Sequence, residues 1–288
     1  VLEVQPKRYR LRLLNGCNSR FLILQFENPD VEVYQIGADG GFLPAPIRLN
    51  DHPYPGSDND PGTGGATVLL ALAERADIIV DFSNAAGTSF KMLNLGPDEP
   101  FGGGIPGVDF DPADPNSTGQ IMEFRVVPAM APDPTTPPQF LVLPPVAPLP
   151  PETVTRPLAL IEKMGMGFDA FGEEVEGPVE ALLGNVDGSG VPVEALWMEP
   201  VTENPAVGAT EVWEFYNTTG DAHPMHVHEV VFEVVNRQAL ELDEDEEPVV
   251  PLNPVGPVMP PEPWETGFKD TVTAYPGQVT RCLLYTSD

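Results

Sequence analysis

Short apolar or alternating segments follow one another along the first half of the chain. Those between residues 9 and 128 read "YRLRLLN", "RFLILQF", "VEVYQIG", "ATVLLAL", "ADIIVDF", "SFKMLNL" and "GQIMEFRVV". Turn and loop sequences such as "NG", "DGG" and "NDHPYPGSDNDPGTGG" separate them. Alternation with a period of two predicts half-buried strands, and short strands at this spacing are typical of a β-sandwich or barrel. No segment shows a helical period, so the chain is predicted to be all-β.

A proline-rich stretch divides this pattern into two parts. Residues 129–151 read "AMAPDPTTPPQFLVLPPVAPLPP", a composition that favours a stiff, extended linker over a core element. After it the strand pattern returns in "RPLALIE", "TEVWEFYNTTG" and "DTVTAYPGQVTR". The pattern predicts two all-β domains, over residues 1–128 and 152–281, which agrees with the length of 288 residues.

The charge of the chain limits its partners. It carries 44 acidic and 14 basic residues, and its formal net charge is −30. Such a surface repels nucleic acid phosphates and anionic membranes, so neither is expected as a partner. An acidic, lysine-poor surface is typical of halophilic proteins, in which salt screens the repulsion between carboxylates. No apolar run has the length of a transmembrane helix, and no signal peptide begins at Val1.

Three of the four histidines, His223, His226 and His228, lie in "DAHPMHVHEVVFEV". Pro224 excludes a helix and favours an extended conformation at His223, while the following residues predict a buried strand. Residues two apart on a strand project to one face, so His226 and His228 are expected to place their rings close together. Neutral imidazole suits copper, zinc, iron and nickel, and the segment is therefore a candidate metal site.

The remaining candidates for metal chemistry are weaker. His52 stands alone in "NDHPYPG" and is interpreted as an ordinary hydrogen-bonded histidine. A zinc or iron enzyme would need a nearby carboxylate, but Glu229 alternates to the opposite face from His228. Cys17 is predicted to be a small buried residue between strands, and no disulfide framework follows from two cysteines.

Several segments together resemble one family. They are "YRLRLLNGCNSRFLILQF", "YQIGADGGFLPAPI", "LALAERADIIVDFS", "GQIMEFRV", "GATEVWEFYNTTGDAHPMHVHEVVFEVVNRQ" and "ETGFKDTVTAYPGQVTR". In number and order they resemble the second and third domains of three-domain multicopper oxidases of the bacterial laccase, spore-coat and bilirubin-oxidase type. The resemblance implies two cupredoxin-like Greek-key β-sandwich domains, the first without its initial strand and the second truncated at its C-terminus.

The resemblance also implies a cofactor and ligands. By position in the motif, His223 matches a ligand of the type 1 copper, His226 of the type 2 copper and His228 of one type 3 copper. The implied reaction is one-electron oxidation of a phenolic or similar organic donor, with reduction of dioxygen to water. No other metal ligand, catalytic residue or cofactor-binding residue is assigned here, because the family's remaining ligands belong to a first domain and a C-terminal His-Cys-His segment. That first domain would pack against these two.

The end of the chain carries a further expectation. Residues 282–288, "CLLYTSD", read back into nucleotides that resemble a transposase adapter. Arg281 is therefore expected to be the last native residue, with adapter read-through after it; the alternative is a natural strand centred on "LLY".

The chain alone is expected to be inactive and prone to aggregate. The alternative function is a non-catalytic copper-binding or structural cupredoxin-like protein. Family members are typically extracellular, periplasmic or on the cell surface.

Overall fold

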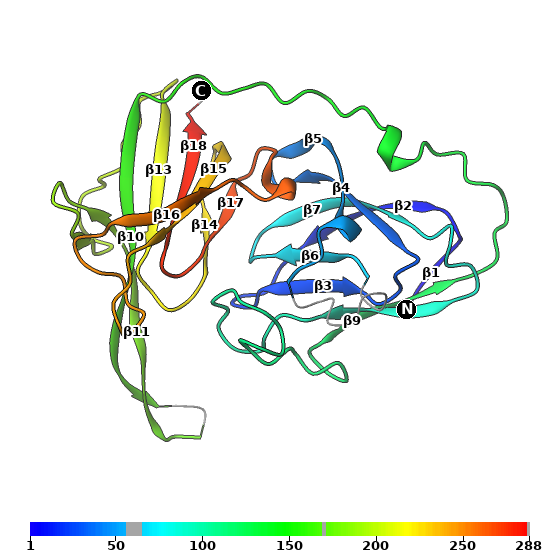
Figure 1. The fold of residues 1–288 in the computed structure, drawn as a ribbon, viewed down its shortest axis with the longest axis horizontal. Helices are drawn as coiled ribbons and strands as arrows, with labels where there is room; N and C mark the ends of the chain where they lie inside the picture. Colours follow the sequence, from blue (N-terminus) through cyan, green and yellow to red (C-terminus); the bar gives the residue numbers. More distant parts are fainter. Residues whose placement is uncertain (56–64, 169–170, 287–288) are drawn as a thin grey trace. The chain divides into compact units, whose positions relative to one another are not determined.

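Strands form the regular structure of the chain, as the alternation of apolar and polar positions predicts (Figure 1). The computed structural model describes residues 1–55, 65–168 and 171–286. Within these residues the helical elements are three 3-10 turns, η1 (Leu49–Asp51), η2 (Pro138–Phe140) and η3 (Pro263–Glu265). The expected all-β class is confirmed. In the described part of the chain, no helix has the length and apolar character needed to cross a membrane.

The described chain divides into two compact units. The first comprises Val1–Ala147 together with Glu262–Val272, and the second comprises Pro148–Pro261 and Thr273–Asp288. Residues 262–272 therefore join the first unit, although they lie inside the sequence range expected for the second domain. Ion pairs of Lys269 with Asp39 and Glu74, and of Asp270 with Arg75, attach these residues to the first unit.

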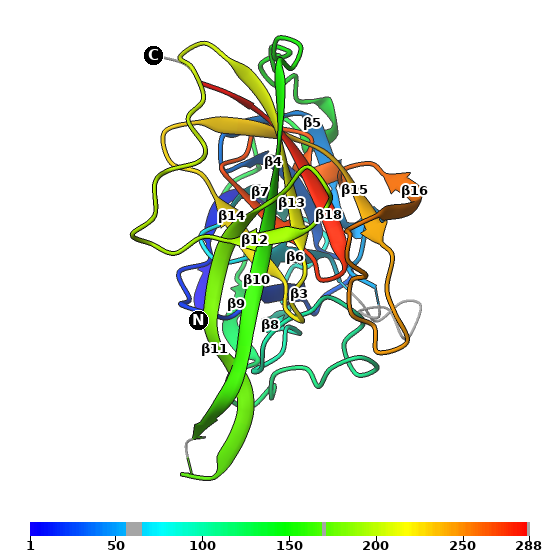
Figure 2. The same ribbon diagram turned by 90° about the vertical axis from the view of Figure 1, so that its left-hand side faces the viewer.

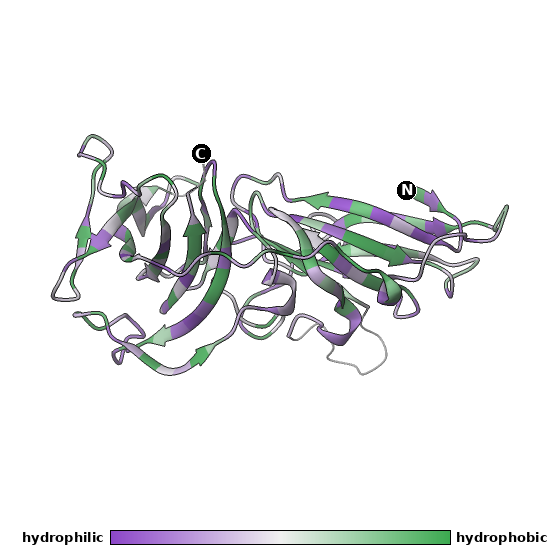
Figure 3. Cartoon of the chain, turned by 90° about the horizontal axis from the view of Figure 1, so that it is seen from above, coloured by the Kyte–Doolittle hydropathy of each residue, from purple (hydrophilic) through white to green (hydrophobic). Residues whose placement is uncertain are grey.

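The first unit contains two sheets. One has the order β1-β9-β8-β3-β6, with bounds β1 (Leu2–Val4), β3 (Leu22–Phe26), β6 (Thr67–Leu70), β8 (Ser89–Asn94) and β9 (Gln120–Val126). The other has the order β2-β7-β4-β5, with bounds β2 (Arg8–Leu14), β4 (Glu32–Ala38), β5 (Gly41–Arg48) and β7 (Arg75–Asp81). Figure 3 shows hydrophobic and hydrophilic residues interspersed along the strands, and in β7 buried residues alternate with half-buried ones.

The two sheets share one core. Leu24 and Phe26 of β3 and Phe124 of β9 belong to the same buried cluster as Ile78 and Val80 of β7. Because these residues come from both sheets, the unit is a β-sandwich. Four phenylalanines fill its centre, with ring centroids of Phe124 at 5.2 Å from Phe82, 5.4 Å from Phe90 and 5.8 Å from Phe26.

The second unit is built on a seven-stranded sheet of order β12-β11-β10-β13-β18-β15-β16. Its strands are β10 (Val154–Phe168), β11 (Glu174–Val186), β12 (Pro192–Glu194), β13 (Thr210–Asn217), β15 (Val231–Leu240), β16 (Pro254–Met259) and β18 (Gln278–Tyr285). Strands β10 and β11 form a long antiparallel hairpin that extends beyond the other strands of the sheet (Figure 2). A separate two-stranded sheet pairs β14 (His223–His226) with β17 (Thr271–Ala274).

The C-terminal residues take part in this sheet. Strand β18 lies between β13 and β15 and continues through Tyr285, and Cys282 is fully buried opposite Trp213 and Val234. Residues 287–288 lie outside the described part of the chain. The interpretation of residues 282–288 as adapter read-through stays a prediction.

Candidate functional site

The histidine segment belongs to the second unit and enters the two-stranded sheet. His223 begins β14, so the extended conformation expected for the residue before Pro224 is confirmed. The buried strand expected after the histidines is present as β15, but it starts only at Val231, since β14 ends at His226 and the residues between them are in neither strand. Glu229 has a φ of 67°, in the left-handed region, and this turns the chain between the two strands.

A hydrogen-bonded turn fixes the position of His223. The buried side chain of Asn217 donates to the carbonyl oxygens of Asp221, at 2.7 Å, and Ala274, at 2.9 Å. Its Oδ1 accepts the backbone N–H of Thr219 at 2.9 Å. The Thr219 hydroxyl in turn lies 2.7 Å from Nε2 of His223, with the nearest Glu162 oxygen at 3.7 Å from the same nitrogen. This contact occupies Nε2, which leaves Nδ1 as the nitrogen that could bind a metal.

Glu162 makes the surroundings of His223 acidic. Burial raises the pKa of the Glu162 carboxyl, an effect that His223 opposes and Asp221 reinforces. A carboxylate beside an imidazole is the usual device for orienting the ring of a metal-bound histidine. Glu162 comes from β10, 61 residues before His223 in the sequence, so only the tertiary structure brings the two together.

The structure brings His226 and His228 together. Their ring centroids are 4.9 Å apart with an interplanar angle of 60°, and both residues are exposed. His228 lies in the bend that follows β14, so the closeness of the rings depends on this bend as well as on strand alternation. Two imidazoles at this separation can supply nitrogen ligands to one metal ion or to two neighbouring ions.

The described residues do not gather a complete metal site. Among them, no group of three or more His, Cys, Asp and Glu side chains is placed to hold a metal ion. The donor chemistry of His226 and His228 fits copper, but a stable centre needs further ligands. The segment therefore offers candidate ligands but not a complete set among the described residues.

Neither cysteine supplements this ligand set. Cys17 is exposed, so the prediction that it is buried between strands is wrong. Asn15 is the buried residue of this turn. Its side-chain amide donates to the carbonyl oxygens of Arg20, at 2.9 Å, and Leu70, at 3.0 Å. Its side-chain oxygen accepts the backbone N–H of Cys17 at 3.0 Å. His52 is exposed, and its ring lies 6.4 Å from that of Trp264.

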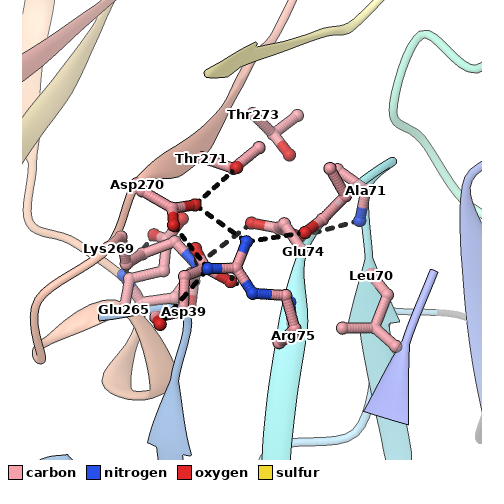
Figure 4. Close-up of polar contacts among 12 residues, drawn as sticks. Asp39, Leu70, Ala71, Glu74, Arg75, Glu265, Lys269, Asp270, Thr271 and Thr273 are labelled. Carbon is pink, nitrogen blue, oxygen red and sulfur yellow. Dashed lines mark hydrogen bonds and ion pairs between the residues drawn. The ribbon is translucent and has the colours of Figure 1, made fainter. Parts of the chain in front are cut away.

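A second polar constellation was not predicted from the sequence. It lies in the first unit and is called here the buried ion cluster: Asp39, Glu74, Arg75, Glu265, Lys269 and Asp270 (Figure 4). Nζ of Lys269 lies 3.0 Å from Asp39 Oδ2 and 3.1 Å from Glu74 Oε1, and its side chain is 5% exposed. Arg75 pairs through both terminal nitrogens with the carboxylate of Asp270. These contacts attach residues 262–272 to the turn after β4 and to the start of β7.

The charges of this cluster shift its pKa values. Burial raises the pKa of Glu74, and the positive charge of Lys269 opposes this shift without cancelling it. Burial by itself would lower the pKa of Lys269, but the charges of Glu74, Asp39 and Glu265 outweigh it, so its pKa is raised. The cluster thus contains four carboxylates and two cations.

One feature of the sequence could have indicated the cluster. The segment "FKD" contains one of only four lysines in the chain, so this lysine stands out among the many acidic residues.

The fold and the histidine segment together define a class: a pair of cupredoxin-like β-sandwich domains with candidate metal ligands in the second. Solved structures agree with this fold. The McoA multicopper oxidase from Aquifex aeolicus superimposes with a TM-score of 0.63 at 24% identity, over 100% of this chain and 50% of that chain. A multi-copper oxidase from Pediococcus acidilactici gives a TM-score of 0.58 at 21% identity, over 98% and 44%.

Sequence relatives identify the family. The multicopper oxidase family model matches residues 191–288. A laccase from Bacillus subtilis (strain 168) is 34% identical over 281 residues, which is 97% of this chain and 46% of that protein. A laccase from Haloferax volcanii is 30% identical over 290 residues, covering 98% of this chain and 40% of that protein. The chain belongs to the multicopper oxidase family, and it spans less than half the length of these two relatives.

Proposed function

We propose that the chain is the two-domain portion of a laccase-like multicopper oxidase. The proposed reaction is one-electron oxidation of a phenolic or similar organic donor coupled to reduction of dioxygen to water. The observation that carries the proposal is the pair of neighbouring imidazoles, His226 and His228, in a chain that is 34% identical to a laccase over 97% of its length. Copper, when bound, supplies the one-electron chemistry of this reaction.

The three histidines would act as ligands of different centres. His226 and His228 place their rings side by side and would serve one copper cluster. The Thr219 hydroxyl lies 2.7 Å from Nε2 of His223, which would serve a separate copper ion through Nδ1. Asn217 and Thr219 are then positioning residues, because they fix the turn from which His223 projects.

Oxygen consumption by the longer oxidase that contains this chain tests the proposed reaction. With a phenolic donor, the His226→Ala and His228→Ala variants should each lose at least about 10-fold in rate, the usual cost of disturbing a metal site. His52→Ala should match the unsubstituted enzyme, because His52 lies in the first unit beside Trp264. Unchanged oxygen consumption in both ligand variants would exclude the proposed roles.

We expect the 288-residue chain alone to bind copper weakly and to show no oxidase activity. Its described residues provide two adjacent imidazoles rather than a complete centre. In a titration with Cu²⁺ followed by electron paramagnetic resonance, the double variant His226→Ala/His228→Ala should weaken binding at least about 10-fold. His52→Ala serves as the matched control and should leave the titration unchanged. Steady oxidation of a phenol by the isolated chain would contradict the expectation.

We also propose that the protein is adapted to high salt, on the basis of its net charge of −30. Raising KCl from about 0.1 M to molar concentration shortens the screening length from about 10 Å to about 3 Å, which weakens repulsion among surface carboxylates. The melting temperature of the chain should therefore rise by at least about 5 °C, equivalent to roughly 2 kcal/mol for a chain of this size. Thermal melts monitored by circular dichroism measure this, and a melting temperature independent of KCl would rule the adaptation out.

A further inference from the structure

A row of residues crosses the outer face of the four-stranded sheet in the first unit. The strand register places Arg12 opposite Asp77, Asp77 opposite Gly37, and Gly37 opposite Phe42. Directly paired residues of neighbouring strands share a face, so their side chains line up across the sheet. Gly37 contributes no side chain, and a Cβ there would lie 2.8 Å from the carbonyl oxygen of Gly41 and 3.2 Å from Cβ of Asp77. Position 37 therefore has no room for a side chain, and none stands in the row between Asp77 and Phe42.

A cavity of about 340 Å³ lies on this face. The residues that line it include Arg10, Arg12 and Arg75 and the apolar residues Leu14 and Phe42. Leu14 is 65% exposed and Phe42 is 36% exposed, so apolar surface is accessible within it. Small-molecule sites are commonly hollows of this size that combine apolar walls with a few charged groups.

One charged group at this cavity, the guanidinium of Arg12, is placed to bind an anion. Arg10 binds Asp77 through Nε and Nη2 and so uses both carboxylate oxygens. Arg12 lies 3.9 Å from the same carboxylate, and its side chain is 78% exposed. Asp77 is held more closely by Arg10 than by Arg12, so the Arg12 guanidinium remains available to bind a further anion. The other charged residues of the lining pair within the buried ion cluster, Asp39 with Lys269 at 3.0 Å and Arg75 with Asp270.

We propose that this cavity binds a small organic carboxylate with an apolar, ring-sized body. The planar fork of the Arg12 guanidinium matches a carboxylate group, which it can bind through two parallel hydrogen bonds. Phe42 and Leu14 would contact the apolar body, and Phe42 is held in place by the Arg10 guanidinium, whose carbon lies 5.6 Å from the ring centroid. The strands of the first unit that carry the site contain no histidine.

Calorimetric titration of the 288-residue chain with benzoate tests the proposal, with benzamide as a neutral probe of the same shape. In about 0.1 M salt, benzoate should bind in the millimolar range and at least about 10-fold more tightly than benzamide, since only benzoate offers a charge-assisted hydrogen bond to Arg12. Equal affinity for the two probes, or no heat from benzoate at tens of millimolar, would overturn the proposal.

Two variants locate the site, and one serves as control. Arg12→Gln should weaken benzoate binding about 10-fold, and Phe42→Ala should weaken it severalfold through loss of the apolar wall. Arg125→Gln alters another exposed arginine, paired with Glu123 at 3.2 Å, and should leave benzoate affinity within about twofold. Thermal melts confirm that each variant is folded. Retained affinity in Arg12→Gln would place benzoate elsewhere and refute the assignment.

Discussion

Replacement of Lys269 by methionine is expected to destabilise the first unit by about 3–5 kcal/mol, because it leaves buried carboxylates without their cation. Lys269 is 4% exposed, and its Nζ is the group shared by Asp39 and Glu74. Methionine keeps most of the side-chain volume, so the loss of unfolding free energy comes from the missing charge rather than from lost packing. Denaturant unfolding of the 288-residue chain, followed by tryptophan fluorescence, measures the change.

Two further variants test whether the loss of unfolding free energy in Lys269→Met comes from the buried charge. Lys163→Met removes a lysine that pairs with Glu194 at 2.7 Å but is 39% exposed, and it should cost less than about 1 kcal/mol. The triple variant Lys269→Met/Asp39→Asn/Glu74→Gln removes the carboxylates together with their cation and should recover at least half of the loss. Equal losses in Lys269→Met and Lys163→Met would show that the buried ion cluster does not stabilise the unit.

The same cluster gives a pH dependence of defined sign. Burial raises the folded-state pKa of Glu74 above its unfolded value, so the folded chain binds this proton more tightly than the unfolded chain. The stabilisation that results is present at low pH and is lost as the pH rises through the folded-state pKa. Glu74→Gln removes this loss, because an amide does not ionise and can still accept the Ala71 N–H that lies 2.7 Å from Glu74 Oε2. The variant should therefore gain stability relative to the parent as the pH is raised.

Substitution of Phe124 by alanine is the second large effect expected, at about 3–5 kcal/mol. Phe124 is fully buried, and its ring lies within 5.8 Å of three other phenylalanine rings between the two sheets. Removing it leaves a cavity that neighbouring rigid rings cannot fill, so the loss exceeds the transfer free energy of the side chain. Urea unfolding monitored by far-ultraviolet circular dichroism gives the value.

The matched control is a phenylalanine outside the core. Phe140 lies in the turn η2 and is 70% exposed, so Phe140→Ala should change stability by less than about 0.5 kcal/mol. Phe124→Leu should cost less than Phe124→Ala, because leucine refills part of the space. If alanine at positions 124 and 140 had the same effect, the sandwich core would not be packed as described.

Much of the fold could be predicted from the sequence because local rules determine it. Alternating positions in "ADIIVDF" place Ile78 and Val80 inside and their neighbours outside, and the structure has that pattern in β7. The proline-rich residues 129–151 form no strand, as their missing N–H groups and fixed φ angles require. The histidine segment could be identified as a candidate because three imidazoles fall within six residues.

Predictions from the sequence pattern were wrong where contacts with residues elsewhere in the chain, or a single backbone dihedral angle, determine the position of a residue. Cys17 is exposed, and Asn15 is the residue of this turn that is buried and bonded, through its side-chain amide, to the carbonyls of Arg20 and Leu70. The strand expected through His228 is interrupted, because Glu229 adopts a left-handed conformation that no strand pattern indicates. Both errors arise in turns, where a single side chain or dihedral angle overrides the periodicity of the flanking residues.

By itself, the sequence determined the strand class, the proline-rich connection and the cluster of candidate ligands His223, His226 and His228, since each depends on residues that are close along the chain. The tertiary structure alone decided that residues 262–272 attach to the first unit, and that Glu162 faces His223. It also decided that Arg12 and Phe42 border one cavity. These arrangements join residues far apart in sequence, and their energies come from buried charge pairing and cross-strand register, which act only once the sheets have formed.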